Sequence, residues 1–357
     1  MKDKEVKINP FEFRARVFVK DVELCRIPEV FFGLRTAERI GILLGVFELD
    51  LNKLKDYFFS LSINEFYKKD LSIAVRCKKR NNKIKLSKKE IEAEVGKWLI
   101  SKIKEELNYT PSCNLEKPDF ILRCDISERY ITFWIDLTGK EAMHIRRYRV
   151  FNHPAPIKGN IASALIKKMK IKENKVFLDP MTGGGTIPIE CAMWAKNISP
   201  CHLRDDFLIF KLKSFEDLKR EDFLKTGERE KNLKIFGSDI NIEFLKGARE
   251  NAKKAGVLDY VKFINLDACN LSKVFKRIDY IAFNPPYGLR VRIGEEEKGV
   301  MRKFFEEAEK VLSNEGKIGI ITARMDLVRK YRRDFKIKWK RKIFHGGVKI
   351  FGFILTK

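Results

Sequence analysis

The residues with the clearest chemical meaning are Asn284, Pro285, Pro286 and Tyr287, which directly follow an apolar run at residues 280–283. Such a run predicts a buried strand, so the four residues stand at the edge of a sheet. The Asn284 amide and the Pro285 carbonyl offer two hydrogen-bond acceptors, Pro286 stiffens the backbone, and Tyr287 offers a flat ring. This set fits a planar group with an exocyclic amine. A proline-rich turn after a core strand is the alternative.

A second set of residues follows earlier strand predictions, at what would be the same edge of the sheet. Asp179 opens a loop that contains the glycines 183–185 and ends where a helix is predicted to begin at Thr186. Glycines at such a place allow a tight turn and a close approach of a ligand to the backbone. Asp239 and Asp267 follow the next two predicted strands. A strand-end carboxylate can accept hydrogen bonds from both hydroxyls of a ribose, although a lone one is more often a turn or cap residue.

The composition is that of a folded protein of two or three domains. The chain has 357 residues, of which 44% are hydrophobic and 34% are charged. No apolar run reaches about 18 residues, and the first residues lack the apolar stretch of a signal peptide. We therefore expect a cytoplasmic protein without a membrane span. The seven cysteines form no Cys-x-x-Cys pair and the four histidines are scattered, so we expect reduced thiols and no metal site.

The net charge of +25 indicates a polyanionic partner. Residues 1–150 carry 31 lysines and arginines against 23 acids, and residues 151–357 carry 43 against 26. The excess therefore lies mostly on the half that contains Asn284, which favours nucleic-acid binding over a merely solubilising surface. The segment 329–342 holds nine lysines and arginines and one acid, with three aromatic residues between them. Phosphate contact and a solvated face are both compatible with that segment.

The N-terminal half shows the patterns of a mixed α/β region. Alternating residues predict a strand over 11–19, and a helix-like stretch follows at 36–44. Ser87 and Glu90 have the spacing of a capping box and predict the start of a helix. The segment 142–156 is basic and contains prolines, so it is typical of a linker. Further strands are predicted over residues 71–77, 118–124 and 130–135.

From residue 161 onward, predicted strands alternate with predicted helices. This alternation is typical of a mostly parallel sheet with helices on both faces, where ligands bind at the carboxyl ends of the strands. The tail around Gly347 predicts a terminal antiparallel hairpin. The predicted strands cover residues 176–178, 235–238, 261–265, 280–283 and 317–322, and the predicted helices cover 186–196, 242–255 and 300–312.

The ordered series of glycine loop, two strand-end acids and Asn-Pro-Pro-Tyr resembles the class I S-adenosylmethionine-dependent methyltransferases, in the branch that methylates amino groups. The resemblance implies a Rossmann-like catalytic domain with S-adenosylmethionine as cofactor. It implies that Asp239 holds the ribose, that Asp267 lies near the adenine, and that Asn284, Pro285 and Tyr287 hold the target amine. The implied cofactor-binding residues are His153, Pro156, Asp179, Thr182, Gly183, Gly185, Thr186, Asp239, Asp267 and Asn284.

The N-terminal half resembles a THUMP domain, an RNA-binding module, in the segments 71–77, 95–96, 118–119 and 135–139. Arg146 and Arg149 match the Arg-x-Tyr-Arg that closes this region in the family, and His153 to Lys158 match the entry to the catalytic domain. The resemblance implies four parts. They are a ferredoxin-like domain (1–60), the THUMP domain (61–141), a linker (142–159) and a Rossmann-like methyltransferase domain (160–357).

A THUMP domain followed by this kind of catalytic domain is similar to RNA guanine-N2 methyltransferases. The residues 284–290 look closer to the enzymes that act on guanosine 6 in the tRNA acceptor stem. The resemblance implies a monomeric cytoplasmic enzyme with tRNA as its partner. Gly184 stands where many relatives have serine, and one small residue for another implies little effect. The expected substrate-binding residues are Arg146, Arg149, Arg290 and Arg292.

Several alternatives share parts of this pattern. A ribosomal RNA guanine-N2 methyltransferase would use the same residues. A DNA adenine-N6 enzyme and a protein glutamine methyltransferase share the Asn-Pro-Pro-Tyr motif. The THUMP-like half argues against the first, and the basic charge argues against the second. A catalytically silent RNA-binding protein is the alternative of a different class, and the intact loop, both acids and Asn284 speak against it.

Overall fold

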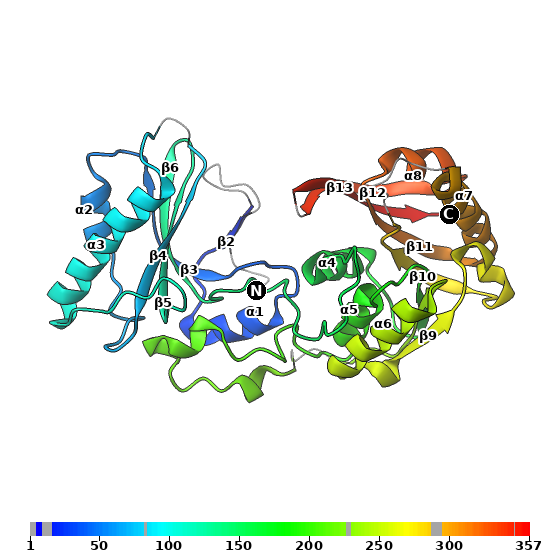
Figure 1. Cartoon of the computed structure of the whole chain (residues 1–357), viewed down its shortest axis with the longest axis horizontal. Helices are drawn as coiled ribbons and strands as arrows, with labels where there is room; N and C mark the ends of the chain where they lie inside the picture. Colours follow the sequence, from blue (N-terminus) through cyan, green and yellow to red (C-terminus); the bar gives the residue numbers. More distant parts are fainter. Residues whose placement is uncertain (1–4, 9–15, 82–83, 226–229, 287–294, 346) are drawn as a thin grey trace. The chain divides into compact units, whose positions relative to one another are not determined.

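The computed structural model describes residues 5–8, 16–81, 84–225, 230–286, 295–345 and 347–357 (Figure 1). Contacts divide the chain into two units. The N-terminal unit contains Met1–Phe31, Glu38–Met143 and Arg204–Phe223, and the C-terminal unit contains Phe32–Ala37, His144–Leu203 and Leu224–Lys357. The predicted domain boundaries at residues 60, 141 and 159 stay predictions. Within the described ranges, no helix is both long enough and apolar enough to cross a membrane.

A four-stranded sheet forms the centre of the N-terminal unit. Its order is β3 (Gly41–Glu48), β6 (Tyr130–Asp136), β5 (Phe120–Ile126) and β4 (Ile73–Lys79), and only β4 and β5 are parallel. Helices α2 (Leu54–Phe59) and α3 (Lys88–Leu107) lie beside this sheet (Figure 1), where Phe58, Phe120 and Phe133 are fully buried. The unit also contains β1 (Val6–Ile8), β2 (Val17–Val19), most of α1 (Ile27–Gly33) and 3₁₀ helices at Leu24–Arg26, Leu208–Lys211, Lys213–Phe215 and Arg220–Phe223.

Most elements predicted for this half are confirmed. The strands predicted over 71–77, 118–124 and 130–135 are β4, β5 and β6, each displaced by two residues or fewer. The capping box is present, because the Ser87 hydroxyl accepts from the Glu90 N–H at 3.2 Å and the Glu90 carboxylate accepts from the Ser87 N–H at 2.7 Å. Of the strand predicted over 11–19, β2 forms the end, and residues 11–15 lie outside the described ranges.

The helix-like stretch predicted at 36–44 is wrong. These residues lead into β3, which pairs antiparallel with β6 from Gly41 opposite Asp136 to Glu48 opposite Tyr130. A side chain at Gly41 would collide with the Trp134 ring, so glycine is what lets the two strands lie together. The period of a short apolar run does not separate helix from strand, and pairing with β6 decides the conformation.

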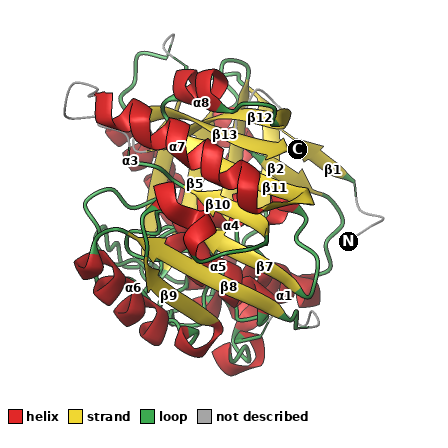
Figure 2. Ribbon diagram, turned by 90° about the vertical axis from the view of Figure 1, so that its right-hand side faces the viewer, coloured by secondary structure: helices red, strands yellow, loops and turns green. Residues whose placement is uncertain are grey.

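A seven-stranded sheet in the order β12-β13-β11-β10-β7-β8-β9 forms the centre of the C-terminal unit (Figure 2). The strands from β11 to β9 are parallel, and β13 runs antiparallel to both β11 and β12. The strands are β7 (Lys175–Asp179), β8 (Leu233–Asp239), β9 (Val261–Asn265), β10 (Ile278–Phe283), β11 (Leu312–Thr322), β12 (Lys336–His345) and β13 (Val348–Thr356).

Helices cover both faces of this sheet. On one face, α4 (Gly159–Met169), α5 (Thr186–Ala195) and α6 (Ile242–Lys254) pack in one hydrophobic core. On the other face, α7 (Glu295–Val311) and α8 (Met325–Tyr331) pack in a second core that contains Phe304, Phe305 and Val328. Two 3₁₀ helices, Leu258–Tyr260 and Ala268–Lys273, complete the unit. The predicted parallel sheet between two helical layers and the terminal hairpin are therefore confirmed.

Ser87→Ala should destabilise the N-terminal unit by about 1 kcal/mol, because it leaves amides at the start of α3 without a partner. The control is Ser101→Ala in the middle of the same helix, where the exposed serine has no cap to lose and the change should stay within about 0.5 kcal/mol. Urea unfolding followed by circular dichroism measures both changes. Equal midpoints for the two variants would contradict the capping assignment.

Candidate active site

The carboxyl ends of four neighbouring strands carry the residues that the sequence singled out. Asn284 follows β10, Asp179 ends β7, Asp239 ends β8, and Asp267 lies two residues after β9. Because the sheet order is β10-β7-β8-β9, the loop after β7 lies between Asn284 on one side and the two later acids on the other. The chain adds β8 and β9 on one side of β7 and then returns β10 to the other side. Open α/β sheets bind ligands at such a reversal.

Backbone hydrogen bonds hold the loop after β7 in place. The Thr182 N–H donates to the Ser238 carbonyl at 2.9 Å, and the Gly185 N–H donates to the Thr182 carbonyl at 2.8 Å. Gly183 and Gly185 have φ angles of +50° and +81°, which strain any residue with a Cβ. The loop then enters α5, so the amides of the first turn of this helix lie at the same edge of the sheet.

The carboxylate of Asp239 is fixed by two backbone amides. One oxygen accepts from the Gly183 N–H at 2.9 Å, and the other accepts from the Asn241 N–H at 2.9 Å. Each carboxylate oxygen has a further lone pair for a ligand hydroxyl. The next residue, Ile240, is 72% exposed, and the Asn265 amide donates to the carbonyls of Asp239 and Ile240 at 3.0 and 2.9 Å. This arrangement can hold a sugar beside a flat apolar group.

The other two acids have different surroundings. Burial of Asp179, helped by the charge of Asp239, raises the pKa of Asp179 well above its ordinary value, although the Met181 N–H bond at 3.1 Å opposes this shift. Asp267 is half-buried, and its carboxylate caps the 3₁₀ helix that follows by accepting from the Cys269 N–H at 2.9 Å. In the described part of the chain, no three His, Cys, Asp or Glu residues are grouped to hold a metal ion.

Asn251 of α6 clamps the entry segment, which we define as residues 150–153, to the glycine loop. Its side-chain oxygen accepts from the amides of Val150 and Phe151, each at 2.9 Å. Its side-chain nitrogen donates to the carbonyls of Phe151 and Gly184 at 3.1 and 2.9 Å. A Cβ at Gly247 would overlap the Phe151 ring, so this glycine makes room for the segment. Asn251 was not predicted as a site residue, because an asparagine inside a helix carries no signal of four distant partners.

His153 lies at the glycine loop, and its implied role in cofactor binding stays a prediction. Its ring packs edge-on against Phe244 with 4.4 Å between centroids, and a Cβ on Gly183 would lie 3.1 Å from it. Burial lowers the pKa of His153, although the charge of Asp239 opposes this effect, so the ring is neutral at pH 7. Pro156 follows as an exposed residue, and Thr186 is buried at the start of α5.

The corner after β10 is described in part. Asn284 is half-buried, Pro285 is buried and Pro286 is exposed. Tyr287, Arg290 and Arg292 lie outside the described residues, and their roles stay predictions.

Arg146 was predicted to bind substrate, and this role stays a prediction. Its side chain is fully buried, and it donates to the Glu190 carboxylate at 2.7 and 3.4 Å and to the Arg35 carbonyl at 2.9 Å. Tyr148 and Ser163 also donate to Glu190, at 3.0 and 2.5 Å. Although burial alone would raise the pKa of Glu190, the Arg146 charge and these hydrogen bonds hold it below its ordinary value. A guanidinium enclosed in this way supports the fold.

Arg149 is half-buried beside the same edge. It donates to the Ile157 carbonyl and, at 3.2 Å, to the Thr186 hydroxyl. These bonds join the region after the entry segment to the start of α5. Its predicted contact with substrate stays a prediction.

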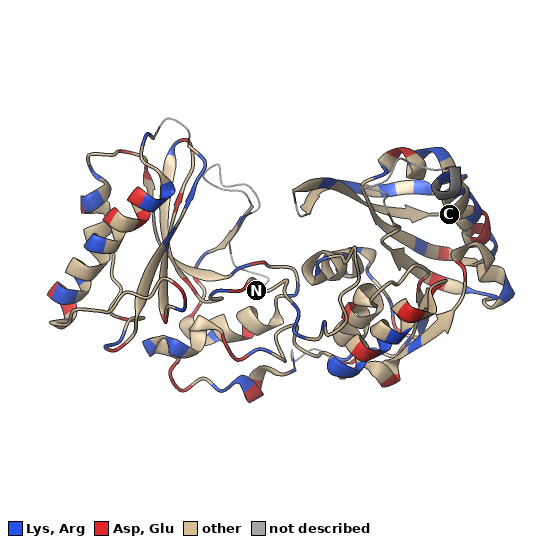
Figure 3. Ribbon diagram, in the orientation of Figure 1, with Lys and Arg blue, Asp and Glu red and all other residues tan. Residues whose placement is uncertain are grey.

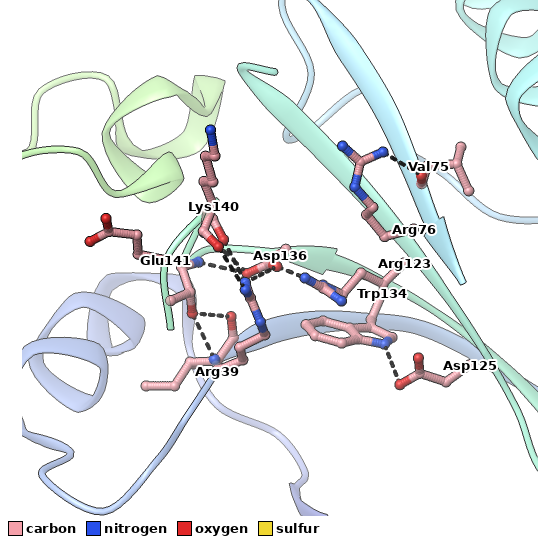
Figure 4. Close-up of polar contacts among 12 residues, drawn as sticks. Arg39, Val75, Arg76, Arg123, Asp125, Trp134, Asp136, Lys140 and Glu141 are labelled. Carbon is pink, nitrogen blue, oxygen red and sulfur yellow. Dashed lines mark hydrogen bonds and ion pairs between the residues drawn. The ribbon is translucent and has the colours of Figure 1, made fainter. Parts of the chain in front are cut away.

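The N-terminal unit has a cationic cavity of about 500 Å³. Figure 4 shows four of its lining residues, Arg39, Arg76, Arg123 and Lys140. Arg39 and Arg123 share the buried carboxylate of Asp136 at 2.9 and 2.6 Å, which leaves one positive charge in excess. Arg76 donates to backbone carbonyls, and Lys140 is exposed. The cavity can therefore accept an anionic group. Its lining residues are Arg39, Arg76, Leu115, Glu116, Pro118, Ile121, Arg123, Gly139 and Lys140.

Comparison with known proteins decides the family. Residues 146–349 match the RMKL-like methyltransferase domain (UPF0020), and residues 48–136 match the THUMP domain. The chain belongs to the RMKL-like methyltransferases. Among relatives, the tRNA (guanine(6)-N2)-methyltransferase of Methanocaldococcus jannaschii is 33% identical over 99% of this chain and 93% of its own. The enzyme of the same name from Archaeoglobus fulgidus is 31% identical over 87% of this chain and 76% of its own.

More distant relatives include the ribosomal RNA large subunit methyltransferase K/L of Buchnera aphidicola. It is 30% identical over 81% of this chain, which matches 42% of that protein. The crystal structure of SMU.472 in complex with SAH has a TM-score of 0.83 to this methyltransferase at 24% identity, covering 99% of this chain and 92% of the other. This likeness agrees with the predicted class I fold behind an N-terminal THUMP region.

Glu190→Gln should destabilise the methyltransferase by about 3–5 kcal/mol, because it leaves the Arg146 charge buried without a counter-ion. The lowered pKa of Glu190 means that the pair stabilises the fold above the unfolded value of about 4.3 and loses its effect as the pH falls through the lower folded value. Urea unfolding at pH 7 measures the change.

The control for this prediction is Glu243→Gln, which breaks an exposed pair with Lys246 (2.8 Å) and should cost less than about 1 kcal/mol. If the two variants unfolded at the same urea concentration, Glu190 would not have the supporting role assigned to it.

Proposed function

We propose that the protein transfers a methyl group from S-adenosylmethionine to N2 of guanosine 6 in tRNA. Relatives that carry this name match almost the whole chain, whereas the ribosomal RNA enzymes match with less than half of their own length. The reaction would take place in the cytoplasm, and we expect a monomer. The ribosomal RNA reaction is the second candidate, because those relatives share the catalytic domain.

The order of the strand ends is the observation that carries this proposal. The glycine loop lies between Asn284 and Asp239 in the sheet. A group that lies across these ends would meet Asp267 and Asp239 at one side, the loop at the centre, and Asn284 at the other. A nucleoside that carries a reactive sulfonium would thus lie next to the residues that receive the target amine.

The residues at this edge fit S-adenosylmethionine. The fixed Asp239 carboxylate suits the two ribose hydroxyls, and the exposed side chain of Ile240 suits the flat face of adenine. The glycine loop, with Asp179, Thr182, Gly183 and Gly185, would face the methionine part. His153, held against that loop, would close it from the other side. When bound, the cofactor supplies an electrophilic methyl group on a sulfonium.

Asn284 and Pro285 would hold the amine of guanine. Guanine N2 is a weak nucleophile because its lone pair is delocalised into the ring. Two acceptors, the Asn284 amide oxygen and the Pro285 carbonyl, would polarise its N–H bonds and fix its direction. No strong base is needed beforehand, because the methylated nitrogen is a strong acid and loses its proton readily. Positioning and electrostatics then account for most of the acceleration. Tyr287 would stack on the extruded base.

Binding of tRNA would use several basic groups. The cationic cavity of the N-terminal unit is the contact that the described residues support best, because four of its nine lining residues are Lys or Arg. Arg149, Arg290 and Arg292 would add contacts near the catalytic corner. Backbone contacts of this kind position a nucleic acid without reading its sequence.

The test of the function uses labelled S-adenosylmethionine with unmodified tRNA transcripts and, in parallel, with unmodified ribosomal RNA, followed by nucleoside analysis and mapping. We expect labelled N2-methylguanosine at position 6, and none in a transcript with adenosine at position 6 and a compensating partner. Label in ribosomal RNA alone would replace the proposal with its alternative.

Asn284→Ala should reduce kcat by about 10²–10³-fold, because it removes one acceptor of the reacting amine. The Kd of S-adenosylmethionine should change by less than twofold, as measured by calorimetry. The control is Asn314→Ala at the opposite end of the sheet, where the exposed residue should be silent in both measurements. An equal loss of turnover and cofactor affinity in the Asn284 variant would be evidence against its assigned role.

Arg76→Ala combined with Lys140→Ala should weaken tRNA binding several-fold and lower the salt dependence of log Kd by about 1 for each phosphate that the protein no longer neutralises. The control is Lys97→Ala, an exposed lysine of α3 that pairs with Glu94 at 3.1 Å. Filter binding at several salt concentrations measures the effect. An unchanged salt slope would remove the cavity from the RNA-binding surface.

A further inference from the structure

The edge strand β12 carries charges of one sign only. Five of its ten residues are Lys or Arg and none is an acid. The five cations are exposed and coloured blue in Figure 3. Lys336, Lys338, Lys340 and Arg341 form no ion pair with any described residue. The strand therefore presents unneutralised positive charge to its surroundings.

The register of the sheet places one end of β12 at the catalytic edge. Phe283, the residue before Asn284, pairs with Ile320 of β11, Ile320 pairs with Phe353 of β13, and Phe353 pairs with Lys340 of β12. Because β12 runs parallel to β10, the residues after Lys340 extend in the same direction as the catalytic corner. Three strand spacings of about 4.8 Å separate the two, or about 14 Å.

The two faces of this strand end have different surroundings. Trp339 and Ile343 pack against the core that α4, α5 and α6 share, and Lys168 of α4 lies over the Trp339 ring at 5.4 Å. The residues that alternate with them, Lys340 and Lys342, point to the other face.

On that face, two lysines lie beside aromatic rings. Lys340 lies 5.6 Å from the Phe351 centroid, and Lys342 lies 5.1 Å from the centroid of Phe344, which is 69% exposed. We call Lys340, Lys342 and Phe344 the basic strand end.

We propose that the basic strand end binds the RNA backbone beside the target nucleotide, with the lysines on phosphates and Phe344 stacked on a neighbouring unpaired base. This proposal rests on the proposed function and extends it to a surface at a defined distance from Asn284. Lysine contacts to phosphate and base stacking on an exposed ring are the two interactions that single-stranded nucleic acid offers. Binding the RNA strand about two nucleotides from the target would hold the RNA backbone in place while the target base leaves its helix.

Protection of the sheet edge is the competing explanation, because lysines on edge strands prevent pairing with other molecules. Two features favour RNA. Protection needs charge of either sign, whereas all the charges of β12 are positive. An exposed phenylalanine at the end of a protected edge would also promote the association that the lysines prevent. Stacking on an RNA base would account for the exposed ring of Phe344.

The experiment compares two charge reversals on the same strand. Lys340→Glu/Lys342→Glu alters the basic strand end, and Lys336→Glu/Lys338→Glu makes the same change of net charge toward the opposite end of β12. We expect the first to weaken tRNA binding at least tenfold and to lower the salt slope by about 1.5, with the cofactor Kd unchanged. The control should weaken binding less than threefold. Phe344→Ala should weaken binding several-fold without altering the salt slope.

Equal effects of the two double variants, or no effect of either, would overturn the proposal. Glutamate protects an edge as well as lysine does, so under the competing explanation both variants would keep wild-type affinity and remain unassociated on size exclusion. Binding is measured by filter retention, independently of turnover. A protein that binds tRNA through this surface but does not methylate it would refute the proposed function and leave the surface in place.

Discussion

Everything at the candidate site depends on β7 lying between β8 and β10 in the sheet. Since parallel strands end at one edge, this order brings together a carboxylate, a glycine loop and an amide that are far apart along the chain. Each lies at the end of a strand buried on both faces, so none can shift without moving the core. The sheet therefore fixes which part of a ligand meets which residue, and the side chains only supply the chemistry.

Two sets of buried polar contacts hold residues 146–153, which lie just before α4. The Arg146–Glu190 pair fixes one end of this stretch, and Asn251 fixes the other beside the glycine loop. Burying such groups is costly unless every partner is present, so these contacts contribute a unique geometry more than net stability. Together, the two sets of contacts keep the His153 ring against Gly183. The same packing accommodates Gly184, where a Cβ would meet His153 and Asn251 at 3.3 Å or more, so a serine would fit there.

The strand-end residues could be predicted from the sequence because each follows a local apolar run. The conformation of 36–44 could not, because β3 exists through its pairing with β6, which lies far away in the chain. The burial of Arg146 could not be predicted either, because it depends on a remote partner, Glu190 of α5. Asn251 gave no local signal at all. Ile240 did give a local signal, because it directly follows an acid at the end of a strand. Its exposure could therefore have been predicted.

The two ends of the strand-end edge of this sheet carry opposite charges. Asp239 and Asp267 lie toward the β9 side, where a nucleoside would need hydrogen-bond acceptors, and burial, together with the charge of Asp239, raises the pKa of Asp179 on the neighbouring strand β7. The cations of β12 lie at the opposite end of the same sheet. A polyanion is repelled by the first side and attracted to the second. Under the proposed function, an RNA strand would approach from β12 and reach Asn284 before the acids, so this charge distribution would both keep phosphates away from the acids and orient the substrate.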